Sequence, residues 1–352
     1  MAFTEIPVIS LSRAREARAA DRQRFADELV AACHEVGFFS LVDHGIPQAD
    51  IDEYFGFVEA FFTLPDDVKS QIDKQKSPHF RGWERVGAEL TDNRVDFREQ
   101  LDLSTENPPF AADAEPIFLR LDGPNQWPPE SALPGFRSVV SQFLARAELL
   151  ADELMGLLAL GLGLPEDVFA HAFGERRHSL AKLIHYPPTP PGEAGVNSHH
   201  DAGFLTLLLQ HGVSGLEVLN QDGDWIAVPP VPGAFVVNLG EMLQAMTGNY
   251  LVATTHRVIA AEERYSSAYF HGPDLRASIA PVGLAPAFAD AVAASPHHRD
   301  AGFMAKRDEL LAGEAGTQSA PVQVYGQMLW NYYCRSYPEV VRRHHPEGIG
   351  AL

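Results

Sequence analysis

The sequence has few cysteines, few basic residues and no long apolar run, and each shortage excludes a class of protein. Only Cys33 and Cys334 occur among 352 residues, so neither a disulfide scaffold nor a thiolate zinc cluster can organise the fold. No uninterrupted apolar stretch approaches the roughly 20 residues that a membrane-spanning helix needs. The start, MAFTEIPVISLS, lacks the basic and apolar regions of a secretion signal. We therefore expect a cytoplasmic protein with no membrane partner.

Positive charge is also scarce. The chain has 27 Lys and Arg against 47 Asp and Glu, a formal net charge of -20. A surface of this sign repels a phosphate backbone, so we expect no nucleic-acid partner. Hydrophobic residues make up 45% of the chain, which is enough for a sizeable core. The sequence favours no particular oligomeric state.

The first part of the chain reads mainly as helices. Apolar spacing predicts helices over about 25–36 and 48–63, on either side of the strand FFSLV. Residues 104–135 are dense in Pro and Gly and predict a surface wrap with little regular structure. A long helix is expected over about 137–161. We assign residues 1–135 to a helical amino-terminal domain that includes this wrap.

The pattern then changes to short strands. SLAKLIHYPP, GFLTLLLQ, LEVLN, WIAVPP, AFVVNLG, LVATTHRVI and RYSSAYFHGP are strand-like runs separated by turn residues. The spacing predicts a mainly β fold with flanking helices around a double-stranded β-helix, or jelly roll. We assign the long helix and jelly roll to a core domain over 136–283. The pattern turns helical again in a carboxy-terminal segment over 284–352, and the family resemblance described below implies that this segment covers the mouth of the barrel.

Two histidines and an aspartate stand in GVNSHHDAGF, before a strand-like run. In an extended strand, His199 and Asp201 share one face while His200 points to the other. Such a pair is most often a turn or an ordinary hydrogen bond. However, His256 ends another apolar run, and a neighbouring strand could bring it to the same place. Two imidazoles and one carboxylate suit non-haem Fe(II) and oxygen, and they would also suit a hydrolytic zinc.

A possible anion clamp follows His256. Arg264 and Ser266 in RYS again share a strand face, and a guanidinium with a hydroxyl can hold a carboxylate. The alternative is that Arg264 is a surface residue paired with Glu262 or Glu263. Beside an open metal site, the clamp fits a dicarboxylate cosubstrate.

These motifs together resemble a known family. GVNSHHDAGFLTLLLQ, the stretch from DGDWIAVPP to TTHRV, RYSSAYFHGP and the amino-terminal CHEVGFFSLVDHGIP are similar to the Fe(II)- and 2-oxoglutarate-dependent dioxygenases of the isopenicillin N synthase-like superfamily. The resemblance implies that His199, Asp201 and His256 bind iron. It implies that Arg264, Ser266 and Tyr186 bind 2-oxoglutarate. Many members carry Asn where this chain has Ile184, and Lys182 or His185 is a candidate substitute.

The resemblance also implies a reaction. An enzyme of this family would use Fe(II), 2-oxoglutarate and O2 to hydroxylate or desaturate a small molecule, with release of succinate and CO2. Similarity to the ethylene-forming enzymes places Glu89, Thr91 and Arg335 near the substrate, which would be an amino acid or an acidic metabolite. The candidate apolar walls are Phe204, Leu207, Val237 and Phe270.

Two other functions remain open at this point. The first is an oxidase like isopenicillin N synthase, which uses no 2-oxoglutarate and whose Arg-x-Ser pair holds a substrate carboxylate. The second is a non-catalytic jelly-roll protein that binds a metal structurally, although structural zinc sites are usually closed by four protein ligands. Succinate formed per oxygen consumed separates the first alternative from the leading function.

Overall fold

The computed structural model describes residues 2–15, 18–91, 94–299 and 323–347. Its α-helices are α1 (Ser12–Arg15), α2 (Ala19–Glu35), α3 (Gln48–Phe62), α4 (Asp66–Lys69), α5 (Phe136–Gly161), α6 (Ala170–Phe173), α7 (Glu241–Met246), α8 (Pro286–Ala294), α9 (Pro296–Arg299), α11 (Tyr325–Ser336) and α12 (Pro338–His344). Short 3-10 helices are η1 (Ser70–Ile72), η2 (Lys74–Lys76) and η3 (Ile117–Leu121). The strands are β1 (Val8–Ser10), β2 (Phe38–Val42), β3 (Gly82–Glu84), β4 (Leu90–Thr91), β5 (Arg94–Val95), β6 (Glu99–Ser104), β7 (Leu180–Tyr186), β8 (Val196–His199), β9 (Leu205–His211), β10 (Leu216–Leu219), β11 (Trp225–Ala227), β12 (Phe235–Leu239), β13 (His256–Val258), β14 (Arg264–His271), β15 (Ser278–Ile279) and β16 (Gln323–Val324).

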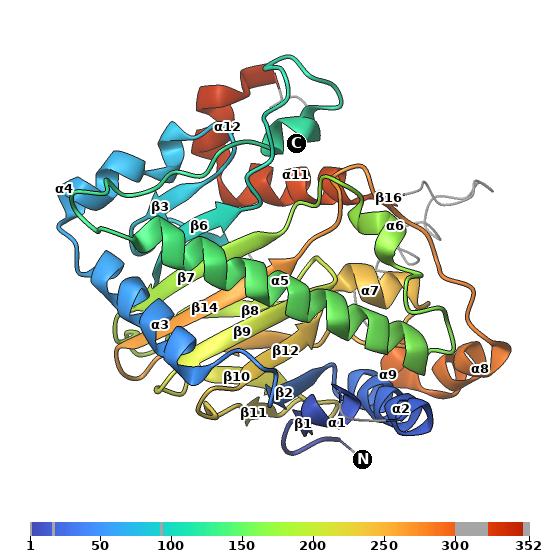
Figure 1. Ribbon diagram of the computed structural model, residues 1–352. Coiled ribbons are helices and arrows are strands. Elements are labelled where there is room, and N and C mark those ends of the chain that lie inside the picture. Colours follow the sequence, from blue (N-terminus) through green and yellow to red (C-terminus); the bar gives the residue numbers. More distant parts are fainter. Residues whose placement is uncertain (1, 16–17, 92–93, 300–322, 348–352) are drawn as a thin grey trace.

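Two sheets face one another and form the centre of the molecule (Figure 1). The large sheet has eight strands in the order β1-β2-β12-β9-β14-β7-β6-β3, and only its β1–β2 pair is parallel. The small sheet has the order β11-β10-β13-β8 and is antiparallel. The predicted jelly-roll core with flanking helices is confirmed.

Alternation along the strands separates the two faces of the large sheet. The outward side chains, such as Leu183, Leu207 and Val237, join the core beneath helices α2, α3 and α5. The inward side chains of β7 and β12, such as Ile184 and Val236, form a second apolar cluster with residues of the small sheet. The space between the two sheets is therefore apolar where the strands face each other directly.

Helix α5 shows how the sequence pattern sets the outer layer. Its buried residues recur at helical spacing and include Val140, Phe143, Ala147 and Leu154, so one face of the helix packs on the sheet. The helix ends close to Gly163, whose φ of 73° suits glycine. The predicted bounds of 137–161 are correct to within one residue.

The register of the large sheet places three rows of inward side chains side by side. One row runs from Asn238 on β12 through Thr206, Phe270 and Leu180 to Ser104 on β6. The next row contains Lys182 and Asp102, and the third contains Ile184 and Gln100. Residues directly opposite in a ladder share a face, so β6 faces the same interior space as β7 and β14.

The amino-terminal part contains more strands than expected. Strands β1 and β2 form one edge of the large sheet, while β6 and β3 form the other. The prediction of helices with an occasional strand therefore missed β6, whose six residues are all buried. The predicted wrap starts one residue too early, because Ser104 still belongs to β6, and residues 105–135 contain η3 and otherwise no helix or strand. The domain boundaries at 135 and 283 stay predictions, and part of the segment 284–352 falls outside the described residues.

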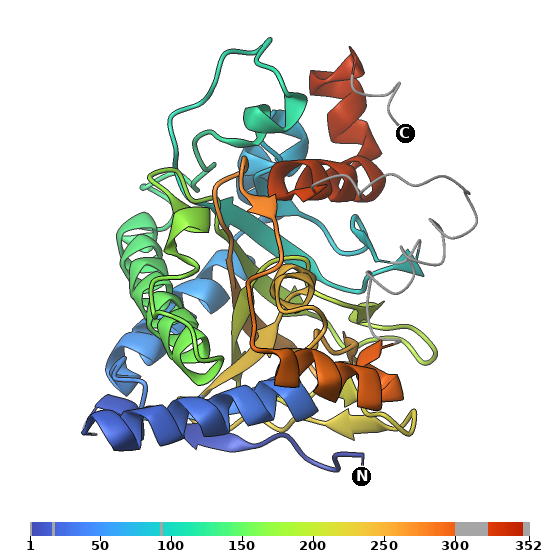
Figure 2. The same cartoon turned by 90° about the vertical axis from the view of Figure 1, so that its right-hand side faces the viewer.

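Helices α11 and α12 lie at the opposite end of the molecule from α2 and the amino terminus (Figure 2). Among the described residues, no helix is both long and apolar enough to span a membrane.

Candidate active site

Three side chains with metal-binding atoms converge where β8 ends and β13 begins. His199 and His256 are register partners on these two strands, and their ring centroids are 4.2 Å apart. Asp201 Oδ1 lies 3.6 Å from His199 Nε2 and 3.8 Å from His256 Nε2. Ligand atoms from all three residues lie within 4.8 Å of one another. The sequence prediction therefore identified a real cluster.

Backbone carbonyls orient both imidazoles. His199 Nδ1 lies 2.8 Å from the carbonyl oxygen of Asn197, and His256 Nδ1 lies 3.2 Å from that of Thr254. Each Nδ1–H can donate to its carbonyl, which leaves a lone pair on Nε2. The two Nε2 atoms are the atoms that face Asp201, so the tautomers suit metal binding.

Two neighbours fix the carboxylate of Asp201. Thr206 Oγ1 donates to Asp201 Oδ2 at 2.5 Å, and Asn238 Nδ2 donates to the same oxygen at 2.7 Å. Oδ1 is thereby directed towards the imidazoles. The sequence analysis did not select Thr206 or Asn238, although each is the single polar residue within an apolar strand, FLTLLL and FVVNL.

The protonation states also suit a cation. Burial lowers the pKa of His199, and burial together with His199 lowers the pKa of His256 to about 4. Burial alone would raise the pKa of Asp201, but His256, His199 and the two hydrogen bonds lower it overall. Two neutral imidazoles and one carboxylate form the donor set that Fe(II) accepts in non-haem oxygenases.

The local geometry differs from the predicted continuous strand. Strand β8 ends at His199, and Asp201 lies in the loop that follows. His200 does not point away from the site, because it lines the cavity described below and its Nε2 lies 2.8 Å from Thr255 Oγ1. His256 opens a short strand and does not end a long one. Loop geometry brings His199 and Asp201 together.

Arg264 and Ser266 lie on the inward face of β14 and are fully buried. Arg264 Nη1 donates to Ser266 Oγ at 3.1 Å, Nη2 donates to Gln210 Oε1 at 3.1 Å, and the guanidinium lies 4.8 Å from the Tyr186 ring centroid. Arg264 therefore does not pair with Glu262 or Glu263 at the surface. Burial lowers the pKa of Arg264, although Tyr186 opposes this effect.

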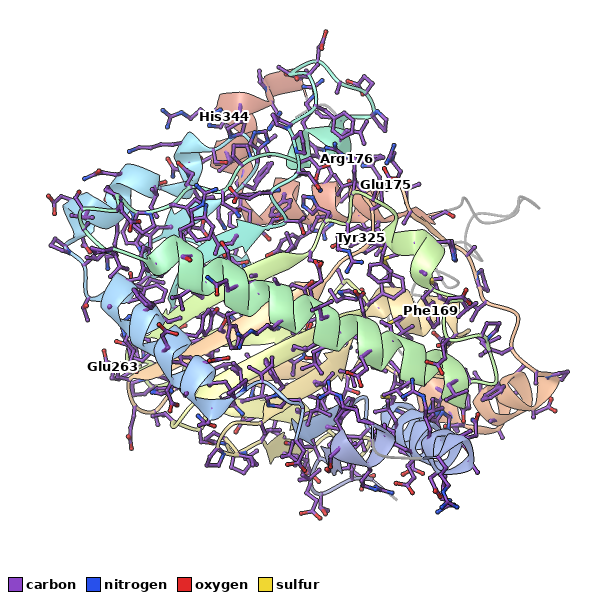
Figure 3. The ribbon with its side chains drawn as sticks, in the orientation of Figure 1. Phe169, Glu175, Arg176, Glu263, Tyr325 and His344 are labelled. Carbon is purple, nitrogen blue, oxygen red and sulfur yellow. The ribbon has the colours of Figure 1, made fainter. Side chains whose placement is uncertain are left out.

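A cavity of about 730 Å³ opens beside the His–Asp–His cluster. Its lining includes His199, Asp201 and Phe270 together with polar residues of β6 and β7, and α11 contributes a wall. Tyr325 begins α11 near one end of β14, whereas Glu263 precedes the other end (Figure 3). Arg264, Ser266 and Tyr186 are not part of the lining, and Tyr186 belongs to the apolar cluster between the sheets.

The four candidate substrate contacts all line this cavity. Glu89 already bonds to Arg98, Lys182 and Tyr332, while Thr91 donates to Asp96. Arg335 is exposed, and no described acidic residue pairs with it. Of the four apolar candidates only Phe270 lines the cavity, because Phe204, Leu207 and Val237 belong to the core on the other face of the sheet.

Two family models match the chain. Residues 6–130 match the amino-terminal domain of the non-haem dioxygenases of morphine synthesis, and residues 177–273 match the 2OG-Fe(II) oxygenase superfamily. The second match contains the His–Asp–His cluster, Arg264 and Ser266.

Curated relatives belong to the same family as the second matching model. The chain is 38% identical to the 2-oxoglutarate-dependent dioxygenase frbJ of Dothideomycetidae sp. (strain 11243), over 77% of this chain and 75% of the relative. It is 32% identical to homoarginine-6-hydroxylase 2-ODD-233 of Oryza sativa subsp. japonica, over 71% of this chain and 78% of that relative. The crystal structure of a full-length Neurospora crassa protein in complex with alpha-KG and thymine superposes with a TM-score of 0.69 at 26% identity. The match covers 80% of this chain and 91% of that protein. This chain therefore belongs to the Fe(II)- and 2-oxoglutarate-dependent oxygenases, and it is an oxidoreductase that uses iron, 2-oxoglutarate and O2 on a small molecule.

Proposed function

We propose that His199 Nε2, His256 Nε2 and Asp201 Oδ1 hold the iron, and that the enzyme hydroxylates or desaturates a small metabolite in the adjoining cavity. The bound metal supplies oxygen activation coupled to decarboxylation of 2-oxoglutarate to succinate. The protein orients the donor atoms through Asn197, Thr254, Thr206 and Asn238, and it confines the substrate in the cavity. We also infer a cytoplasmic location, which fits the two buried free thiols.

Arg264, Ser266 and Tyr186 hold the distal carboxylate of 2-oxoglutarate in this proposal. The observation that carries it is the environment of Arg264, which is fully buried yet bonded only to neutral groups among the described residues. A buried cation without a carboxylate partner is costly, and a bound dicarboxylate would supply that partner. The fork of donors suits a carboxylate.

The substrate side of the proposal is an amino acid or an acidic metabolite. Arg335 provides an exposed cation beside the cavity, and Phe270 provides an apolar wall next to the metal cluster. Because the polar atoms of Glu89 and Thr91 are already bonded, these residues would fix the wall through Arg98, Lys182, Tyr332 and Asp96. A relative named for homoarginine hydroxylation supports an amino acid.

The test is the dependence of turnover on 2-oxoglutarate. The wild type should form about one succinate per O2 consumed. Arg264→Ala should raise the 2-oxoglutarate concentration for half-maximal rate roughly 30- to 160-fold, since a lost charge-assisted pair costs about 2 to 3 kcal/mol. Anaerobic iron binding should change little.

Arg276→Ala is the matched control, because Arg276 is exposed and, within the described part of the chain, its ion pair is with Asp274. It should leave the 2-oxoglutarate requirement unchanged. Turnover without succinate would favour the oxidase, in which Arg264 holds the substrate. An unaltered cosubstrate requirement in Arg264→Ala would refute the assigned role of the fork.

A further inference from the structure

The inward face of β6 has an unusual chemistry. Arg98, Gln100, Asp102 and Ser104 alternate along one face of this stretch, whereas Leu101 and Leu103 face the core. Asp102 and Ser104 line the cavity, and they stand opposite Lys182 and Leu180 of β7, which also line it. The strand thus presents a polar face to the substrate space.

Each residue of this face has a buried polar atom without a bond from the described part of the chain. These atoms are Arg98 Nε, Gln100 Oε1, Asp102 Oδ1 and Ser104 Oγ. Asp102 is 6% exposed and Ser104 is 9% exposed, so neither is a surface group. Buried carboxylate oxygens are almost always bonded, and leaving one without a donor is costly. Three of these four atoms, those of Gln100, Asp102 and Ser104, can accept a hydrogen bond. A ligand that donates hydrogen bonds would satisfy them.

The charge of the surrounding network selects the kind of donor. Lys74 pairs with Glu84 and Asp102, Lys182 pairs with Glu89 and Asp102, and Arg98 pairs with Glu89 and Asp96. Three cations thus meet four carboxylates, so this buried network lacks one positive charge. Burial, with a smaller contribution from the nearby Glu89 carboxylate, raises the pKa of Glu84 and of Asp96.

The other buried basic residue of the lining, Arg81, does not fill this need. Arg81 is buried in the lining, but its guanidinium donates to the carbonyl oxygens of Leu121, Gly123 and Thr105. Lys74 and Lys182 both approach Asp102 Oδ2, at 2.6 Å and 3.4 Å. Asp102 Oδ1 is left as a buried acceptor without a hydrogen-bond partner among the described residues, on a residue that lines the cavity.

We infer that Asp102 Oδ1 and Ser104 Oγ form a subsite for a positively charged nitrogen of the substrate, such as an ammonium or guanidinium group. The inference rests on the proposed function and names the substrate class of the same cavity. Ser104 ends the row that begins at Asn238 and Thr206, three strand spacings from Thr206, or roughly 14 Å along the sheet. The charged nitrogen and the oxidised carbon are therefore different parts of the substrate. Asp102 and Ser104 would bind the end with the nitrogen, and the iron would oxidise the other end.

The first experiment compares matched probes on the wild-type enzyme loaded anaerobically with Fe(II) and 2-oxoglutarate. The pairs are L-lysine with L-norleucine, L-arginine with L-citrulline, and tryptamine with indole-3-ethanol. Binding is read from the change that each probe causes in the visible metal-to-ligand charge-transfer band. The basic member of at least one pair should bind tenfold or more tightly than its neutral partner. Equal binding within the pairs, or no response to any basic member, would overturn the inference. Failure of the band to form would instead count against the proposed function.

Variants then test the residues. Asp102→Asn should weaken the responding basic probe at least tenfold and leave the neutral probe unaffected, and Ser104→Ala should weaken it severalfold without changing any charge. Glu84→Gln is the matched control, because Glu84 belongs to the network but does not line the cavity. It removes the surplus negative charge of the network but leaves Asp102 Oδ1 and Ser104 Oγ in place, so it should reduce the preference severalfold less than Asp102→Asn does. Thermal unfolding reports whether each variant folds. If Asp102→Asn does not fold, Ser104→Ala still tests the subsite. An unchanged preference in both cavity variants, or an equal loss in Glu84→Gln, would refute the subsite.

Discussion

At the scale of single residues, the orientation of the Asp201 carboxylate, a proposed metal ligand, depends on its hydrogen-bond partners. Its Oδ2 accepts two short hydrogen bonds, which hold the carboxylate in one orientation with Oδ1 towards the two imidazoles. The strand that carries Thr206 is bonded to the strand that carries Asn238, and both strands are central in the large sheet. The rigid sheet therefore sets the position of a ligand that lies in a loop.

Thr206→Val should weaken iron binding about 10- to 100-fold, since the variant keeps the shape of the side chain but loses the bond that orients Asp201. Anaerobic titration with Fe(II) measures the effect. Thr189→Val is the control, because Thr189 Oγ1 is buried without a hydrogen-bond partner among the described residues. That change should leave both iron affinity and stability nearly unaltered. Equal iron affinity in Thr206→Val and the wild type would show that Asn238 alone suffices.

A second residue-scale prediction concerns His298. Its Nδ1 lies 2.7 Å from Ser295 Oγ, its Nε2 lies 2.8 Å from the His34 carbonyl, and its ring contacts those of His34 and His297. Burial lowers its pKa to about 4, against about 6.5 in an unfolded chain. Between these values the unfolded chain binds more protons, so the free energy of unfolding should fall as pH falls.

The slope from this one group is at most about 1.4 kcal/mol per pH unit. Urea unfolding between about pH 5 and about pH 7 should therefore show a flatter pH dependence in His298→Asn than in the wild type. The exposed His171 gives the control, and His171→Asn should retain the wild-type slope. Parallel curves for His298→Asn and the wild type would mean that the ring already carries a proton in the folded state.

At the scale of elements, the amino end of α7 fixes the loop that contains Asp201. The Gly240 N–H donates to the Phe204 carbonyl, and the Glu241 N–H donates to the Asp201 carbonyl, each at 2.8 Å. A Cβ at Gly240 would lie 2.1 Å from the Gly203 carbonyl oxygen. Only glycine allows the loop and the helix to approach this closely.

Gly240→Ala should therefore cost about 1 to 3 kcal/mol of stability and displace the iron ligand. Chemical denaturation and Fe(II) titration measure the two effects. Gly56→Ala on α3 is the matched control, since a Cβ there would have no atom within 4 Å among the described residues, apart from its chain neighbours and its own helix backbone. In a helix this change should stabilise by about 0.5 to 1 kcal/mol. Normal iron affinity in Gly240→Ala would show that the loop can move without disturbing Asp201.

The elements also show what the sequence could predict. The strands of the jelly roll and helix α5 were predictable because their apolar periodicity reflects direct burial against a neighbouring layer. Strand β6 was missed because Glu99, Asp102 and Arg98 look like solvated residues. The carboxylates of Glu99 and Asp102 pair with Lys69, Lys74 and Lys182, which come from distant elements, and only the folded chain brings these groups together.

The candidate site was predictable for a different reason. His199 and Asp201 are neighbours in the sequence, and His256 pairs with His199 through adjacent strands. Thr206 and Asn238 were not predictable as a pair, since their common target depends on the strand register. Asp102 and Ser104 escaped notice because β6 itself was not identified.

At the scale of the whole molecule, the site joins parts that are far apart in the sequence. The proposed metal ligands come from the small sheet and an adjoining loop, and Arg264 comes from the large sheet. Binding of iron and 2-oxoglutarate should therefore stabilise the whole fold, because the unfolded chain cannot assemble these groups.

Fe(II) at about one hundred times its dissociation constant should add about 2.7 kcal/mol to the free energy of unfolding. Anaerobic thermal unfolding should show a higher midpoint with iron, a further increase with 2-oxoglutarate, and a return to the starting value after chelation. Asp201→Ala should fold but gain no stability from either addition. A midpoint that iron does not change in the wild type would contradict the assigned ligands.

The position of β6 has an evolutionary consequence. The part of the polar cavity wall that β6 forms is encoded before residue 105, whereas the metal cluster and the Arg264 fork are encoded after residue 195. Mutation or recombination in the early part of such a gene could therefore replace what the enzyme accepts while its oxidative chemistry stays intact. Divergence of new specificities would then be expected to accumulate in β6 and the hairpin before it sooner than in the catalytic strands.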